Sequence, residues 1–112
     1  MATYENAAKH LLNNGDAGVQ IYECPAGKSA MVKTCQVANV DGSNSADVSI
    51  FWKDNSDGDA IYYLAKTIPV PPNTALPVLG DALVLEAGDT LWGVASADGD
   101  LDATISIRED DV

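Results

Sequence analysis

A chain of 112 residues, 46% of them hydrophobic and 21% charged, is long enough to bury one core, which predicts a single globular domain and argues against a wholly disordered chain. Its 17 acidic residues outnumber 6 basic ones and give a net charge of −11, which argues against nucleic acids and anionic membrane surfaces as partners. No signal-peptide pattern and no apolar run long enough to span a bilayer is visible, so we expect synthesis in the cytoplasm.

In chain order, the sequence predicts short strands separated by turns. Residues 1–8 show no periodicity, which is typical of a flexible arm or one short helical turn. A candidate short strand at 9–12 and a loop at 13–18 follow. Further strands are expected at 19–24, 30–40, 47–53, 60–67, 82–86, 90–96 and 101–107.

The side-chain patterns of these strands predict which residues face the core. Apolar residues alternate with polar ones from Leu101 to Ile107, which predicts one buried face. In 47–53, Phe51 is expected on the face opposite Val48 and Trp52. The strand at 30–40 does not alternate cleanly, which predicts a bulge or a bend.

Turn residues punctuate the chain at regular intervals. Pro25 and Gly27 predict a tight turn ending at Lys28, and Asp41-Gly42 is among the strongest short hairpin signals. The prolines within 69–72 exclude a regular central strand there and predict an edge or a crossover.

About eight short antiparallel strands at this spacing are typical of an all-β fold, namely a β-sandwich or jelly roll, with a small barrel as the alternative. We expect an N-terminal arm at 1–9, the β-sandwich domain at 10–108 and a solvated acidic tail at 109–112.

The sequence offers little for catalysis, cofactor binding or metal binding. His10 is the only histidine, and no nucleophile motif surrounds it, so we expect neither an enzyme nor a cleft that holds His10 beside a carboxylate or thiol. One histidine with Cys24 and Cys35 makes no zinc pattern, and both cysteines are expected to be free and buried. We expect no cofactor.

Two acidic loops raise the question of calcium binding. The loop at 54–59 lacks the spacing of an EF-hand, because a glycine at its sixth position would place Lys53 at the first. Solvated turn carboxylates are the favoured interpretation, and calcium binding is left open. The aspartates concerned are Asp54, Asp57, Asp59, Asp98, Asp100 and Asp102.

Consecutive apolar residues on two strands must occupy both faces of a sheet, so some of them are expected to meet a partner. Phe51 with Trp52, and Ile61 to Leu64, form such runs. A homo-oligomer is the common way to cover such a surface. The candidate contact surface is Phe51, Tyr62, Tyr63 and Trp92.

Three segments together resemble small virion proteins of tailed bacteriophages, cyanophages included. The segments are YECPAGKSAMVKTCQVANVDGSNSADVSIFW (22–52), LAKTIPVPPNTALPVL (64–79) and LVLEAGDTLWGVASADGDLDATISI (83–107). The resemblance covers roughly residues 18 to 107. It implies a non-enzymatic decoration or cement protein on the capsid exterior, a dimer or trimer that binds the major capsid protein.

Two other functions are compatible with the same residues. A tail, neck or fibre protein of the virion would have a similar sequence. A carbohydrate- or receptor-binding module would use exposed aromatic side chains, for which the candidates are Tyr22, Phe51, Trp52, Tyr62, Tyr63 and Trp92.

Overall fold

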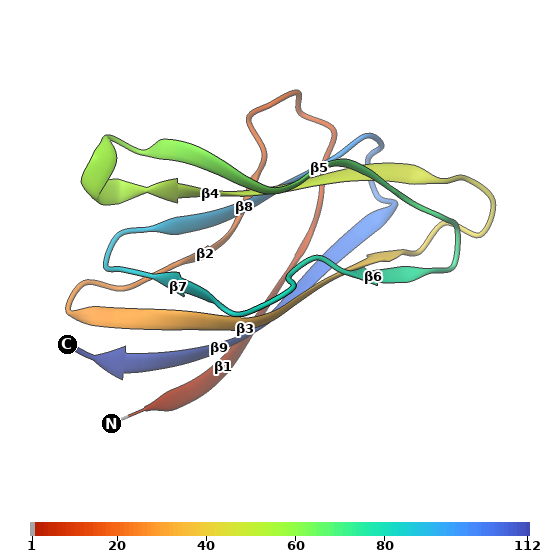
Figure 1. Cartoon of the computed structure of the whole chain (residues 1–112). Coiled ribbons are helices and arrows are strands. Elements are labelled where there is room, and N and C mark those ends of the chain that lie inside the picture. The colour runs from red at the N-terminus through yellow and green to blue at the C-terminus, as the bar shows by residue number, and fades with distance from the viewer. Residues whose placement is uncertain (1) are drawn as a thin grey trace.

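The computed structural model describes residues 2–112, which form nine strands and one short 3-10 helix (Figure 1). The helix η1 spans Asn55–Asp57. The strands are β1 (Thr3–His10), β2 (Val19–Glu23), β3 (Lys28–Asn39), β4 (Ala46–Asp54), β5 (Ala60–Val70), β6 (Ala75–Pro77), β7 (Leu83–Leu85), β8 (Thr90–Ala95) and β9 (Leu101–Asp111).

The strands form two antiparallel sheets that face each other. One sheet has the order β1-β9-β3-β6, with β7 also paired to β3, and the other has the order β2-β8-β4-β5. The chain changes sheet at every connection except β4 to β5 and β6 to β7, which is the topology of a jelly roll. The predicted all-β sandwich is therefore confirmed. The structure has nine strands where about eight were expected, because two short strands, β6 and β7, pair with different parts of the same edge of β3.

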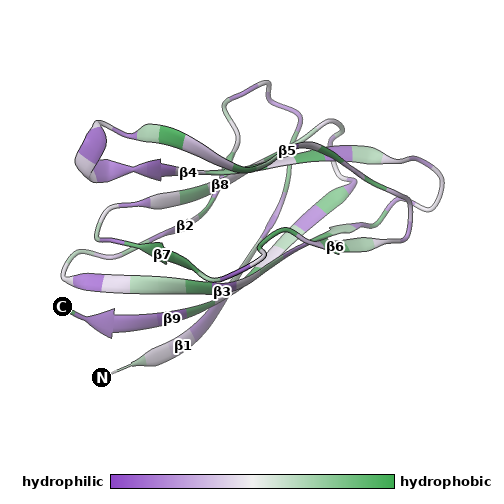
Figure 2. Cartoon of the chain, viewed as in Figure 1, coloured by the Kyte–Doolittle hydropathy of each residue, from purple (hydrophilic) through white to green (hydrophobic). Residues whose placement is uncertain are grey.

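The core lies between the sheets and follows the predicted alternation. Leu101, Ala103, Ile105 and Ile107 of β9 are all buried, whereas Thr104 between them is exposed. Figure 2 shows hydrophobic residues along β3 and β8, and polar ones at η1 and at the end of β9. The register of β3 against β9 shifts between Val32 and Thr34, which confirms the predicted irregularity of that strand.

Both ends of the chain differ from the expected arm and tail. Thr3–His10 is a strand paired with β9 along its whole length, from Thr3↔Glu109 to His10↔Asp102. It shows little alternation because it is an edge strand, exposed at nearly every position. At the other end β9 continues to Asp111, and Glu109, expected in the solvated tail, is only 5% exposed.

The predicted turns are present, but two of them join different sheets. Lys28 N–H donates to the Pro25 carbonyl at 3.3 Å, and Gly27 has a φ of 76°, as the turn prediction requires. This turn connects β2 to β3 across the sandwich and therefore does not form a hairpin within one sheet. The Asp41 carboxylate accepts from Ser43 and Asn44 N–H groups, which makes an Asx turn between β3 and β4 in place of a two-residue hairpin.

Candidate functional site

The four predicted contact residues have different environments. Tyr62 is 48% exposed and Tyr63 is 43% exposed, and Trp92 is half-buried. Phe51 is only 1% exposed, so in this chain it offers no surface of its own to a partner. The contact surface itself remains a prediction.

Phe51, Tyr63 and Trp92 form an aromatic row across the outer face of the four-stranded sheet. Phe51 on β4 lies opposite both Tyr63 on β5 and Trp92 on β8. The ring centres of Phe51 and Tyr63 are 5.4 Å apart, and those of Phe51 and Trp92 are 6.3 Å apart. The rings of Phe51 and Trp92 are nearly parallel. The structure therefore brings these three predicted residues together.

Phe51 is buried because a distant loop covers it. A Cβ atom at Gly18 would lie 3.1 Å from the Phe51 ring, and the φ of Gly18 is +79°. Glycine thus permits both the backbone conformation and the close approach at this position. The strand pattern correctly predicted the face that Phe51 occupies, whereas nothing near Phe51 in sequence indicated the loop.

Tyr62 lies on the opposite face of its strand. Its ring stacks on Trp52, with 5.2 Å between the ring centres, and Trp52 packs against the hydrophobic core. Tyr62 is therefore separated from the aromatic row and lies at the open rim between the sheets.

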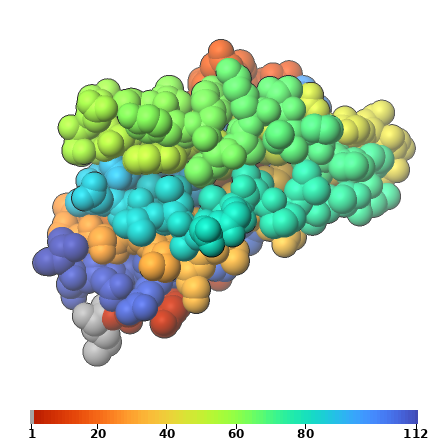
Figure 3. Space-filling model, viewed as in Figure 1, coloured from red at the N-terminus to blue at the C-terminus, as the bar shows by residue number. Residues whose placement is uncertain are grey.

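β5 is an edge strand that carries several exposed apolar side chains. Ile61 and Ile68 are 49% and 41% exposed, in addition to Tyr62 and Tyr63. Figure 3 shows this strand, in green, along one rim of the molecule, uncovered in that view. Ile68 is absent from the predicted contact surface, although the apolar residues around Pro69 were a signal for it.

The two halves of β5 differ in how readily their free edge could pair with a further strand. The second half contains Lys66, Thr67 with a φ of 54°, and Pro69, which interrupt pairing with a further strand. The first half, Ala60 to Leu64, contains neither charge nor proline. The other edges are protected by charged residues on β1, by a register shift in β2, by the proline at the end of the short β6 and by the shortness of the three-residue β7.

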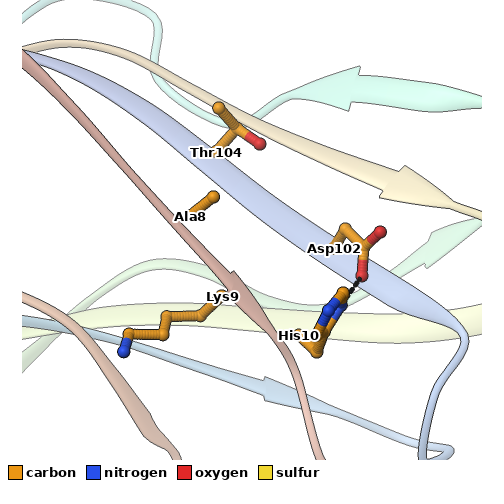
Figure 4. Close-up of a pocket in the computed structure, with 5 residues that line it drawn as sticks. All are labelled: Ala8, Lys9, His10, Asp102 and Thr104. Carbon is orange, nitrogen blue, oxygen red and sulfur yellow. Dashed lines mark hydrogen bonds and ion pairs between the residues drawn. The ribbon is translucent and has the colours of Figure 1, made fainter.

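A shallow cavity of about 240 Å³ between β1 and β9 contains the histidine (Figure 4). His10 Nδ1 lies 2.6 Å from Asp102 Oδ1, so a histidine beside a carboxylate in a cavity, which the sequence analysis did not expect, is present. The His10 side chain is 86% exposed. Within the described residues no hydrogen bond joins His10 to Thr104, so the base–nucleophile contact of triad chemistry is not formed.

A buried carboxylate lies at the end of the sandwich near both termini. The Tyr22 hydroxyl donates to Glu109, and burial together with this carboxylate raises the pKa of Tyr22 well above its ordinary value. Repulsion by Glu109 raises the pKa of Glu5 on the neighbouring strand. Lys28 nearby pairs with Asp111 at 2.7 Å, which lowers the pKa of Asp111.

Both cysteines are free and buried, as predicted. Burial raises the pKa of Cys35 to about 11. Burial, followed by the charges of Glu109 and Asp89, raises the pKa of Cys24. At neutral pH both groups are thiols, which are weak nucleophiles.

The acidic loops use several of their carboxylates in local hydrogen bonds. Asp54 accepts from Ser56 at the start of η1, and Asp98 accepts from the Asn13 N–H at 2.7 Å. Between residues 2 and 112, no three acidic, histidine or cysteine side chains gather closely enough to hold a metal ion. In the same part of the chain, no helix has the length and hydrophobicity to cross a membrane.

Comparison with known proteins relates the chain to others by structure. No protein-family profile matches it, and no curated protein sequence matches it. A chain of Bacillus endospore appendages, a family of disulfide-linked pili, is similar with a TM-score of 0.57 and 10% identity, over 100% of this chain and 88% of that one.

Two chains of infectious bursal disease virus are also similar. One, from the Gx strain, has a TM-score of 0.53 and 12% identity, and the other, from the T13 viral particle, has a TM-score of 0.51 and 10% identity. The present chain covers only 31% and 30% of their lengths, while 97% and 96% of it is matched. At these identities the likeness establishes a shared jelly-roll fold.

Proposed function

We propose that this chain is a non-enzymatic structural protein of a bacteriophage virion, a capsid decoration protein that oligomerises and binds the major capsid protein lattice. The sequence resemblance to phage virion proteins supports this role. The jelly roll adds support, because viral capsid domains use this fold. The pilus chain and the viral-particle chains described above both come from large assemblies.

The exposed first half of β5 carries the proposal. Ile61, Tyr62 and Tyr63 present apolar side chains on both faces of an edge strand whose outer backbone groups have no neighbouring strand in the described chain. Such an edge is able to pair with a second chain, and isolated soluble proteins protect it. We place the contact between copies of this chain here.

The rest of the surface suits a particle exterior. The net charge of −11 makes neighbouring particles repel one another and keeps the free protein soluble. The contact at β5 must therefore depend on apolar burial and backbone pairing, which are less sensitive to salt than ion pairs are.

Sedimentation velocity tests this contact. We expect the unmodified chain to sediment as a dimer or trimer and Ile61→Asp to sediment as a monomer, because the new charge lies on the unprotected half of the edge. Val84→Asp is the matched control: Val84 is 57% exposed on β7, in the other sheet. An oligomer mass that Ile61→Asp leaves unchanged would contradict the placement, and a monomeric unmodified chain would contradict oligomerisation.

A further inference from the structure

A polar cavity of about 440 Å³ lies on the outer face of the four-stranded sheet, on the side of β2 and β8. Its volume falls within the roughly 300 to 1,000 Å³ that is typical of ligand sites. Two rows of cross-strand neighbours form its floor, Gln20 beside Trp92 and Glu23 beside Thr90 with Lys53. The turn after β4, carrying Asn55 and Asp59, forms its wall together with Gly88.

Trp92 supplies a fixed aromatic surface in this cavity. Its Nε1–H donates to Thr90 Oγ1 at 2.7 Å, and its ring is nearly parallel to the buried Phe51. Lys53 Nζ lies 4.1 Å from the ring centre. The ring is therefore held in one orientation, and the ammonium group over its face is carried on a flexible side chain that must move before a ligand packs there.

Polar side chains surround this ring and are not engaged with the rest of the protein. Gln20, Glu23 and Asp59 are exposed, and within residues 2–112 no hydrogen bond or ion pair involves their side chains. The Asn55 side chain lies against Gly88, where a Cβ atom would approach its amide nitrogen to 2.5 Å. Amide and carboxylate groups are thus available for a ligand beside an apolar ring.

We propose that this cavity binds a neutral saccharide. A pyranose ring has an apolar face of C–H groups, which packs on an indole ring, and hydroxyl groups at its edge, which pair with amides and carboxylates. The two carboxylates outweigh the one ammonium group, and the whole chain is acidic, so sugars that carry a carboxylate or sulfate are disfavoured. In the bound state the Lys53 ammonium donates to a sugar oxygen.

The cavity and the proposed assembly contact occupy different parts of the same sheet and approach each other near the turn that carries Asp59. The cavity lies on the outer face over β2, β8 and the end of β4, where Lys53 is the cross-strand neighbour of Ile61, whereas the proposed contact is the outer edge of β5. An oligomer joined at β5 would leave the cavity open, so one particle would present many copies of a weak saccharide site.

Tryptophan fluorescence provides the test. In Trp52→Phe the remaining tryptophan is Trp92, and its emission is followed during titration with cellotriose, maltotriose, mannotriose and chitotriose, with sialyllactose as the anionic comparison. We expect a saturable change with at least one neutral trisaccharide and weaker binding of sialyllactose. Calorimetric titration of the unmodified chain measures the same affinities without the substitution.

Two matched glutamine variants then locate the site. Gln20→Ala is expected to weaken binding about fivefold, the effect of losing one neutral hydrogen bond. Gln36→Ala, which changes another exposed glutamine, on β3 in the other sheet, is expected to leave affinity unchanged. The proposal is overturned if all four neutral sugars leave Trp92 emission and the calorimetric signal unchanged, if sialyllactose binds most tightly, or if both variants bind equally.

Discussion

The carboxyl group of Glu5 lies beside Glu109 at the end of the sandwich, where Tyr22, Lys28 and Cys24 also contribute to the local field. Repulsion from Glu109 raises the pKa of Glu5 above its ordinary value in the folded chain. The folded chain therefore binds this proton more tightly than the unfolded chain does. The contribution of Glu5 to the free energy of unfolding therefore decreases as the pH rises from the ordinary pKa of a glutamate to the raised pKa of Glu5 in the folded chain.

Replacing Glu5 should remove this pH dependence. We expect Glu5→Gln to melt at a higher temperature than the unmodified chain at pH 7, because the amide carries no charge and is able to donate to Glu109. The difference should shrink as the pH falls towards about 4, where the carboxyl group of the unmodified chain is protonated. Melting curves followed by circular dichroism between these values measure both effects.

The control is Glu86→Gln, which removes one exposed carboxylate at the start of the turn between β7 and β8. It is expected to alter the melting temperature little and equally at all pH values. A Glu5→Gln effect that is the same at pH 4 and pH 7 would show that charge repulsion with Glu109 is not its cause.

Among the elements, β1 shows how an edge strand escapes detection by sequence pattern. It pairs with β9 alone, and seven of its eight residues are exposed. The strand is nevertheless expected to contribute to stability, because without it the edge of β9 would be open to solvent beside the buried Ile105 and Ile107.

Truncation distinguishes this strand from the flexible arm that the sequence predicted. Removing residues 2–10 should lower the melting temperature by more than about 10 °C, as the loss of a few kcal/mol does in a domain of this size. An unattached arm would leave the melting temperature unchanged, and that result would contradict the pairing of β1 with β9.

The sequence predicted elements better than their connections. The alternation in β9 identified its buried face, and turn residues located η1 and the Pro25–Lys28 turn. Whether a turn stays in one sheet or crosses to the other depends on packing between residues far apart in sequence. The Asp41-Gly42 pair therefore wrongly indicated a hairpin. The burial of Phe51 by the loop at Gly18 has the same origin.

The candidate site was predictable to a similar extent. The consecutive apolar residues of β5 indicated that some would be exposed, and Tyr62 and Tyr63 are. The cavity at Trp92 was not predictable, because its lining comes from β2, β4, β8, the turn after β4 and the turn before β8. Only the register of the sheet brings these residues together.

At the scale of the whole molecule, the jelly roll is an elongated block of 45 × 28 × 21 Å with both termini at the same end. The apolar edge of β5 runs along one side, and the polar cavity opens on the outer face of the same sheet. This arrangement allows a copy of the chain to be held at one edge while its outer face stays accessible, as a protein on a capsid surface requires.

Cryo-electron microscopy of the phage particles proposed to carry this chain would show directly where the chain lies. We expect density for the jelly roll in regular copies on the outside of the capsid, in contact with the major capsid protein and joined to its neighbours along β5. Density confined to the tail or neck would contradict the capsid placement. Absence of the chain from purified particles would contradict the structural role itself.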